Sequence, residues 1–303
     1  MTARDTLLSD INRLRRERKA VILAHNYQRP DVQDIADYTG DSLGLSRQAA
    51  ATGADVIVFC GVHFMAQTAK LLSPDKTVLL PEAGAGCPMA DMITPGQLRA
   101  FKAEHPGLPV VAYVNTTAEV KADSDICCTS ANAVEVVRSL DAEAVLFIPD
   151  RNLGRWVQRH VPEKRVICYD GFCPTHEFIT ADMIQDARRH HPDAIVMAHP
   201  ECLEEVVEIA DVVRSTSGML KYARESEAQE FIVATELGIL HPLQKDSPEK
   251  RFYPMFVALC PNMKLTTLES LKTSLELGIH PTEVPEDIAQ RARVTVERMV
   301  AIG

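Results

Sequence analysis

Short apolar runs rich in valine and isoleucine alternate along the chain with longer segments whose apolar residues recur at helical spacing. Three of these runs end at His25, Tyr113 and His199. A continuous apolar run is typical of a strand that is covered on both faces of a parallel sheet. Strands that alternate with helices predict parallel β-α-β units. The pattern therefore predicts an α/β protein built on parallel sheets.

The same series of features occurs three times, and its clearest marker is a cysteine followed directly by proline. Cys87, Cys173 and Cys260 carry this marker and are 86 and 87 residues apart. A first apolar run, an aspartate with a hydroxyl residue five positions later, a second apolar run and a Pro-acid-Lys unit precede each cysteine. Such a period indicates repeated structural units. We therefore expect three homologous three-layer α/β repeats with parallel sheets around a pseudo-threefold axis, with an active site at the centre.

Two of the repeated pieces have defined positions in each unit. The aspartate and hydroxyl pairs are Asp37 with Ser42, Asp125 with Ser130, and Asp211 with Thr216. The Pro-acid-Lys units end at Lys76, Lys164 and Lys250. Because serine is a favoured helix N-cap, we expect helices to begin after Ser42, Ser130 and Ser217.

The repeat sets the expected domain organisation. We expect an N-terminal helix over residues 1–18, repeats over 19–105, 106–191 and 192–272, and a helical extension over 273–303. The extension has Pro285 in its first turn and an apolar stripe formed by Ile288, Ala292, Val296 and Met299. This spacing predicts an amphipathic helix that packs on the outside of the repeats.

Composition narrows the class of protein. The chain has 303 residues, of which 46% are apolar and 24% charged, with a net charge of −10. These values exclude a disordered or fibrous protein, and the acidic balance argues against a nucleic-acid binder. No apolar stretch approaches the ~20 residues that span a membrane, and the N-terminus has no signal-peptide core. We expect a cytoplasmic protein that binds neither nucleic acid nor membrane.

The eight cysteines include three that recur with the repeat, and these are candidate metal ligands. No pair forms a CxxC motif, and in a reducing compartment disulfides are not expected. Equivalent strand ends around one axis would bring Cys87, Cys173 and Cys260 to one face. A zinc site would need a fourth ligand, which His176 could supply. A 4Fe–4S cluster would instead leave one iron open to act as a Lewis acid on substrate oxygen.

Other polar groups also fall at or just beyond predicted strand ends. His25, Tyr27, His176, His199 and Glu201 offer imidazole, phenol and carboxylate groups for general acid–base chemistry. Hydroxyl residues at predicted helix starts suit the binding of carboxylate or phosphate. These residues are Ser42, Ser130 and Thr216.

Several stretches together resemble one family over essentially the whole chain. They are LAHNYQRPDVQDIADYTGDSL, CGVHFMAQTAKLLSP, AYVNTTAEVKADSDICCTSANA, DGFCPTHE, AHPECLEEV, RSTSGM, FIVATELGILHPL and CPNMKLTTLE. The sequence is similar to the quinolinate synthases of bacteria and archaea. The resemblance implies a triangle of three α/β domains and an enzyme of de novo NAD synthesis. That enzyme condenses iminoaspartate with dihydroxyacetone phosphate and releases phosphate and two waters to form quinolinate.

The resemblance also assigns expected roles to residues. It implies a 4Fe–4S cluster on Cys87, Cys173 and Cys260, with one open iron. It implies catalytic roles for Tyr27, His176, His199 and Glu201. The expected substrate-binding residues are His25, Ser42, Tyr113, Asn115, Ser130, Ser215 and Thr216.

Two positions depart from the family pattern, and two other functions stay open. Gln67 stands where glutamate is expected, and Arg214 stands where a small residue is expected. The alternatives are another iron–sulfur or zinc hydro-lyase on the same scaffold and a non-catalytic repeat scaffold. The strand-end cysteines, histidines and tyrosines argue against the scaffold, which has no need of them. A transient contact with an oxidase or dehydrogenase that produces iminoaspartate is a further expectation.

Overall fold

A computed structural model describes residues 2–302 and contains three four-stranded sheets, all parallel. Each sheet has its strands in the same order, second, first, third and fourth along the chain. The first sheet contains β1 (Ala20–His25), β2 (Tyr38–Gly40), β3 (Val56–Cys60) and β4 (Thr77–Leu79). The second contains β5 (Val110–Tyr113), β6 (Ile126–Cys128), β7 (Ala144–Ile148) and β8 (Arg165–Cys168). The third contains β9 (Ile195–Ala198), β10 (Val212–Val213), β11 (Glu230–Ala234) and β12 (Arg251–Pro254). The predicted α/β class with three repeated units is confirmed.

Helices connect the strands and cover the sheets. The first unit has α2 (Pro30–Ile35), α3 (Ser42–Ala51) and α4 (His63–Leu72). The second has α6 (Ala118–Ala122), α7 (Ala133–Ser139) and α8 (Arg151–His160), and the third has α11 (Glu204–Ile209), α12 (Thr216–Glu225) and α13 (Leu240–Asp246). The remaining helices are α1 (Ala3–Glu17), α5 (Pro95–Glu104), α9 (Pro174–Glu177), α10 (Ala181–His190), α14 (Leu268–Leu277) and α15 (Glu286–Val300), with 3₁₀ turns η1 (Ala90–Met92), η2 (Leu237–Ile239) and η3 (Asn262–Lys264).

The first sheet shows why its strands are apolar along their whole length. On β1, Val21 and Leu23 belong to the apolar cluster that includes α3 and α4. Ile22 and Ala24 alternate with them and belong to the cluster that includes α1, α2 and α14. Since side chains alternate along a strand, both faces of this sheet are covered. This is the three-layer arrangement that the continuous apolar runs predict.

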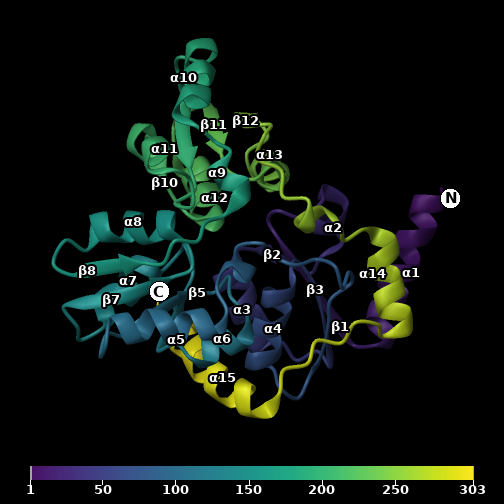
Figure 1. Ribbon diagram of the computed structural model, residues 1–303. Coiled ribbons are helices and arrows are strands. Elements are labelled where there is room, and N and C mark those ends of the chain that lie inside the picture. Colours follow the sequence, from purple (N-terminus) through teal and green to yellow (C-terminus); the bar gives the residue numbers. More distant parts are fainter. Residues whose placement is uncertain (1, 303) are drawn as a thin grey trace.

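The three units form a triangle (Figure 1). The third unit, in green, lies above the first, in purple and blue, and the second, in teal. Helix α14 leaves the third unit and packs against α1 and β3 of the first. Helix α15 packs against α4 of the first unit and α6 of the second, so the predicted amphipathic helix lies outside the repeats and joins two of them. The predicted limit of the third repeat at residue 272 falls within α14, and the domain limits stay a prediction.

Each unit has a short edge strand that the apolar pattern did not predict, and the repeated aspartate holds it. These strands, β2, β6 and β10, have only two or three residues, which is too short for a periodic signal. The carboxylates of Asp37, Asp125 and Asp211 accept hydrogen bonds from the backbone N–H of Ile22, Val110 and Val196, at 2.9, 2.7 and 2.8 Å. The aspartate therefore ties the start of each edge strand to the first strand of its unit.

The repeated lysine has an equally regular structural role. Lys76, Lys164 and Lys250 donate hydrogen bonds to backbone carbonyls at the ends of α3, α7 and α12. A cation at a helix C-terminus satisfies free carbonyls and interacts favourably with the helix dipole. The Pro-acid-Lys unit is therefore a helix-capping device rather than part of the chemistry.

The predicted N-caps of three helices are wrong by one to two residues. Helix α3 is capped by Asp41, whose Oδ1 accepts from the N–H of Gly44 at 2.9 Å. Helix α12 is capped by Ser215 instead of Ser217, and α7 begins after Asn132. Asp, Asn and Ser cap helices about equally well, so propensity does not choose between neighbours of these types. Among residues 2–302, no helix combines the length and apolar character needed to cross a bilayer.

Candidate active site

A cavity of about 300 Å³ lies where the three units meet, and residues from every unit line it. The first unit contributes His25, Tyr27, Ser42 and Cys87. The second contributes Tyr113, Asn115, Ser130, Cys173 and His176, and the third contributes His199, Glu201, Thr216, Glu236 and Cys260. The cavity therefore gathers thirteen of the fourteen residues predicted to form the site, all but Ser215.

The sheet order explains this convergence. In each sheet the second and third strands lie on opposite sides of the first strand, so the strand order reverses there. In open parallel sheets, ligands bind at the carboxyl ends of the strands beside such a switch point. His25 and Tyr113 are the last residues of β1 and β5, and His199 directly follows β9. Tyr27, Asn115 and Glu201 follow two residues later in each unit. The three equivalent loops thus present different chemistry to one space.

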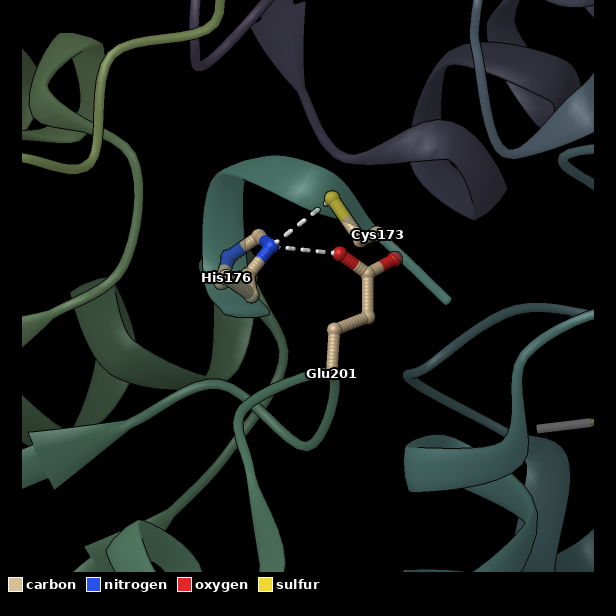
Figure 2. Close-up of side chains that lie close together, drawn as sticks. All are labelled: Cys173, His176 and Glu201. Carbon is tan, nitrogen blue, oxygen red and sulfur yellow. Dashed lines mark hydrogen bonds and ion pairs between the residues drawn. The ribbon is translucent and has the colours of Figure 1, made fainter. Parts of the chain in front are cut away.

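Glu201 lies at the centre of the polar contacts. Its Oε1 accepts a hydrogen bond of 2.6 Å from the hydroxyl of Tyr113. Its Oε2 lies 2.8 Å from Nδ1 of His176, the contact drawn in Figure 2. The Glu201 side chain is 5% exposed, and that of His176 is 1% exposed. A buried carboxylate needs such partners to stay charged.

His176 extends this contact toward Tyr27. Its Nε2 lies 2.8 Å from Oγ1 of Thr235, and the hydroxyl of Tyr27 lies 2.6 Å from the same oxygen. With the imidazole proton on Nδ1 facing Glu201, Nε2 accepts from Thr235, and Thr235 accepts from Tyr27. A continuous chain of hydrogen bonds then runs from Tyr27 of the first unit to Glu201 of the third. Such a chain can carry a proton between two groups without bulk water.

His25 and His199 share one conformation. The Nδ1 of His25 accepts from the N–H of Tyr27 at 3.1 Å, and the Nδ1 of His199 accepts from the N–H of Glu201 at 3.4 Å. Each ring therefore carries its proton on Nε2. The Nε2 atom of His199 lies 3.1 Å from Oγ of Ser130. Burial lowers the pKa of both histidines to about 3. Both are neutral hydrogen-bond donors at neutral pH.

Burial and hydrogen bonding act in opposite directions on Glu201. Burial raises the pKa of its carboxyl group, but the His176 and His199 rings and the hydrogen bonds from His176 and Tyr113 outweigh it and hold the pKa below its usual value. Burial raises the pKa of Tyr27 and of Tyr113 well above the usual value for tyrosine, so both keep their protons.

The three repeat cysteines face the same cavity. Burial raises the pKa of Cys87 to about 12 and also raises the pKa of Cys173 and Cys260. They are therefore neutral thiols in the metal-free protein, and a bound metal would displace their protons.

The spacing of the side chains bears on the kind of metal group. A tetrahedral zinc ion with bonds of about 2.3 Å needs sulfur atoms about 3.8 Å apart. Within residues 2–302, the one set of three ligand atoms closer together than 4.8 Å belongs to Cys173, His176 and Glu201, shown in Figure 2. At least one pair of the sulfur atoms of Cys87, Cys173 and Cys260 is therefore farther apart than 4.8 Å, which is too far for a single zinc ion.

The other cysteines lie away from this cavity. Cys60, Cys127, Cys128 and Cys202 are buried in apolar surroundings, and Cys168 is half-buried. None of these five lines the cavity. Cys87, Cys173 and Cys260 occupy equivalent positions in the three repeats, whereas these five cysteines have no equivalent cysteine in the other repeats.

Most of the residues predicted to bind the substrate line the cavity, but Ser215 does not. Ser42 and Thr216 begin α3 and α12 and line the cavity, and Thr216 accepts a hydrogen bond of 2.9 Å from Asn26. The buried Oδ1 of Asn115 has no hydrogen-bond partner and is available to a ligand donor. Ser215 does not line the cavity, because its hydroxyl caps α12 by accepting from Gly218 at 3.3 Å.

Neither departure from the family pattern lines the cavity. The Oε1 of Gln67 accepts a hydrogen bond of 3.1 Å from the N–H of Ala118 at the start of α6. The guanidinium of Arg214 is exposed and donates to the carbonyl of Val213. Both side chains therefore have structural contacts outside the site.

Sequence reasoning missed two buried residues at the site, Thr235 and Glu236. Both follow β11, the third strand of the third unit, and are about 1% and 0% exposed. The repeat marks the ends of the first strands and the cysteines, but it leaves the ends of the third strands unmarked. A polar Thr-Glu pair directly after an apolar strand was the available signal.

Comparison with known proteins gives one family. The family model described as quinolinate synthetase A protein matches residues 9–301. The quinolinate synthase of Geobacter metallireducens is 56% identical over 299 residues, covering 98% of both chains. Those of Thermodesulfovibrio yellowstonii and Methanoregula boonei are each 54% identical, covering 97% and 98% of this chain and 98% of their own. With this similarity over nearly its whole length, and with the predicted residues gathered in one cavity, the chain belongs to the quinolinate synthase family of enzymes.

Proposed function

We propose that this chain condenses iminoaspartate with dihydroxyacetone phosphate to quinolinate, with release of phosphate and two waters. The observation that carries the proposal is the cavity itself. Three thiols and a hydrogen-bonded chain of acid–base groups, contributed by three units, border the same space. Ring formation by imine condensation and dehydration needs proton donors and acceptors that are held close together.

A 4Fe–4S cluster held by Cys87, Cys173 and Cys260 fits the donor set. Thiolates are the protein ligands of such clusters. When bound, the cluster supplies one iron without a protein ligand, which acts as a Lewis acid on a substrate oxygen. The spacing of the thiols supports this group over a single zinc ion.

The anionic groups of the substrates bind to neutral donors. The Nε2–H groups of His25 and His199 donate without carrying a charge, and the start of α3 at Ser42 offers free backbone N–H groups. Tyr113, Asn115, Ser130 and Thr216 add further polar groups, and Ser215 fixes the start of α12 behind Thr216.

Proton transfer belongs to the hydrogen-bonded chain. Oε2 of Glu201 lies 2.8 Å from Nδ1 of His176 and accepts the proton that this nitrogen carries, while Nε2 of His176 takes up a proton from Thr235. His176 exchanges protons with Tyr27 through Thr235. His199 holds its proton on Nε2 beside Ser130 and orients the ligand there. The expected contact with an enzyme that produces iminoaspartate stays a prediction.

Replacement of single cysteines tests the proposal. Cys87→Ala, Cys173→Ala and Cys260→Ala should each lose the iron, the visible absorbance and quinolinate formation in anaerobically purified protein. Cys60→Ala, Cys128→Ala and Cys202→Ala are matched controls and should keep all three. Loss of the iron in a control variant, or quinolinate formation by a protein without iron, would contradict the assignment.

A further inference from the structure

Glu236 and Lys264 form a buried ion pair that has no place in the proton-transfer chain. The Nζ of Lys264 lies 2.9 Å from Oε1 and 3.0 Å from Oε2 of Glu236. The Glu236 side chain is 0% exposed and the Lys264 side chain 20% exposed. Ion pairs buried to this degree gain little net stability, because the loss of hydration offsets their attraction. We therefore infer the role of this ion pair from the other groups that Glu236 and Lys264 contact.

On one side, the pair holds the backbone of a repeat cysteine. The Oε1 of Glu236 accepts a hydrogen bond of 3.1 Å from the N–H of Cys260. Its Oε2 accepts a bond of 2.6 Å from the N–H of Gly238. Glu236 thus ties the end of β11 to the loop that carries Cys260.

On the other side, the pair holds the backbone of Tyr27. The Nζ of Lys264 donates a hydrogen bond to the carbonyl oxygen of Tyr27, which belongs to the first unit. Lys264 therefore connects Glu236 of the third unit directly to the loop that carries the Tyr27 phenol. The path from Cys260 to Tyr27 consists of two side chains and three hydrogen-bonded contacts.

Gly238 of the third unit lies very close to the backbone of Tyr27 in the first unit. A Cβ atom at this position would lie 2.6 Å from the carbonyl carbon and oxygen of Tyr27 and 2.7 Å from Nζ of Lys264. Any larger residue would push the Tyr27 carbonyl away from Lys264. The side chain of Gln33 adds a second tie, since its Nε2 donates to the carbonyls of Gly238 and Gln28 at 3.0 and 2.9 Å.

We propose that Glu236 and Lys264 are positioning residues that join the backbone of Cys260 to that of Tyr27 and so set the phenol against the site. The proposal rests on the role given to Tyr27 under the proposed function. Neither residue touches the reacting atoms in this role. Lys264 also neutralises Glu236, which would otherwise present a bare negative charge to a cavity that receives anionic substrates.

The first test follows amide hydrogen exchange in the anaerobically purified protein. Lys264→Met should speed exchange in residues 26–29 at least tenfold and leave helix α8 unchanged. Lys272→Met is the matched control, because Lys272 pairs with Glu276 on the exposed face of α14. Equal exchange of residues 26–29 in both variants would overturn the proposal. This readout does not depend on turnover, so it stands even if Tyr27→Phe proves fully active and removes the catalytic role of Tyr27.

The second test separates position from charge. Glu236→Gln combined with Lys264→Met removes the charge but also the tie to Tyr27. If the pair positions Tyr27, the double variant should keep a kcat at least tenfold below that of the unchanged protein, with the same iron content. Full recovery of kcat in the double variant would show that only charge matters and would overturn the proposal.

Gly238→Ala keeps the proposal testable if Lys264→Met does not fold. It leaves both charges in place and displaces the Tyr27 carbonyl and the Lys264 ammonium group from each other. We expect lower kcat, unchanged iron content and faster exchange confined to residues 26–29. Unchanged kcat and exchange in folded Gly238→Ala protein would contradict the proposed positioning.

Discussion

The hydroxyl of Tyr113 lies 2.6 Å from Oε1 of Glu201, although the two residues are 88 positions apart. Tyr113 ends the first strand of the second unit, and Glu201 lies two residues beyond the equivalent position of the third. The first unit provides His25 and Tyr27 at the same two positions. The three units thus present equivalent loops to one space, and the different residues of these loops provide a donor, an acceptor and a neutral histidine.

Glu201→Gln should abolish most turnover while leaving the metal group in place. Glutamine keeps an oxygen for the Tyr113 hydroxyl but cannot take up a proton. We expect kcat to fall about a thousandfold, in the range that general acid–base groups contribute. Iron content and quinolinate formation, measured on the same anaerobic sample, give the two readouts. Glu227→Gln, at an exposed position, is the control, and a comparable kcat in both variants would remove Glu201 from proton transfer.

Tyr113→Phe should shift the pH dependence of turnover. The Tyr113 hydroxyl is one of the groups that lower the pKa of Glu201, so its loss lets that pKa rise. A base must be ionised to act, and therefore the acidic limb of the kcat profile should move to higher pH. Profiles of both proteins, followed from pH 8 down to the lowest pH at which each protein stays folded, check this. An unchanged acidic limb would mean that ionisation of Glu201 does not limit the rate.

The position of the three cysteines could be predicted because a short, recognisable signal survived in every repeat. The Cys-Pro dipeptide marks equivalent points, and equivalence around an axis implies proximity. The same logic placed His25, Tyr113 and His199 at strand ends, where the structure has them. When a sequence contains such a repeat, residues at equivalent positions can be predicted to lie close together even though no contacts are known.

Features without a periodic signal could not be predicted in this way. Strand β10 has two residues, Val212 and Val213, which are too few for an apolar pattern, and the recurring Asp211 that holds it does not by itself indicate a strand. Thr235 joins Tyr27 and His176 across separations of 208 and 59 residues. Such contacts depend on how the units dock, and the local sequence around Thr235 carries no sign of its partners.

His25 should make the protein less stable in acid. Its pKa is about 3 in the folded protein and about 6.5 when unfolded. Between these values the unfolded chain binds a proton that the folded protein does not, so stability is present above pH 6.5 and is lost as the pH falls toward 3. This one histidine should cost about 2 kcal/mol between pH 7 and pH 5.

His25→Asn tests this, since asparagine can still accept from the N–H of Tyr27. Urea unfolding of the metal-free proteins at pH 7 and pH 5 gives the free energies. The loss of stability between the two pH values should be about 2 kcal/mol smaller in the variant. His199 has the same pKa shift and should account for a similar remaining loss. An equal loss in both proteins would place the acid sensitivity elsewhere.

Asp125→Ala should weaken the fold without affecting the chemistry. The Asp125 carboxylate accepts a hydrogen bond of 2.7 Å from the N–H of Val110 and thereby holds the start of β6 beside β5. A hydrogen bond to a charged group contributes about 2 kcal/mol, and its removal should lower the free energy of unfolding by that amount. Asp211→Ala should have a similar effect, because its carboxylate makes the same bond to Val196. Asp141→Ala, at an exposed position, should change stability by less than about 0.5 kcal/mol. If the variants at Asp125 and Asp211 were as stable as the one at Asp141, the repeated aspartate would have no role in holding the edge strands.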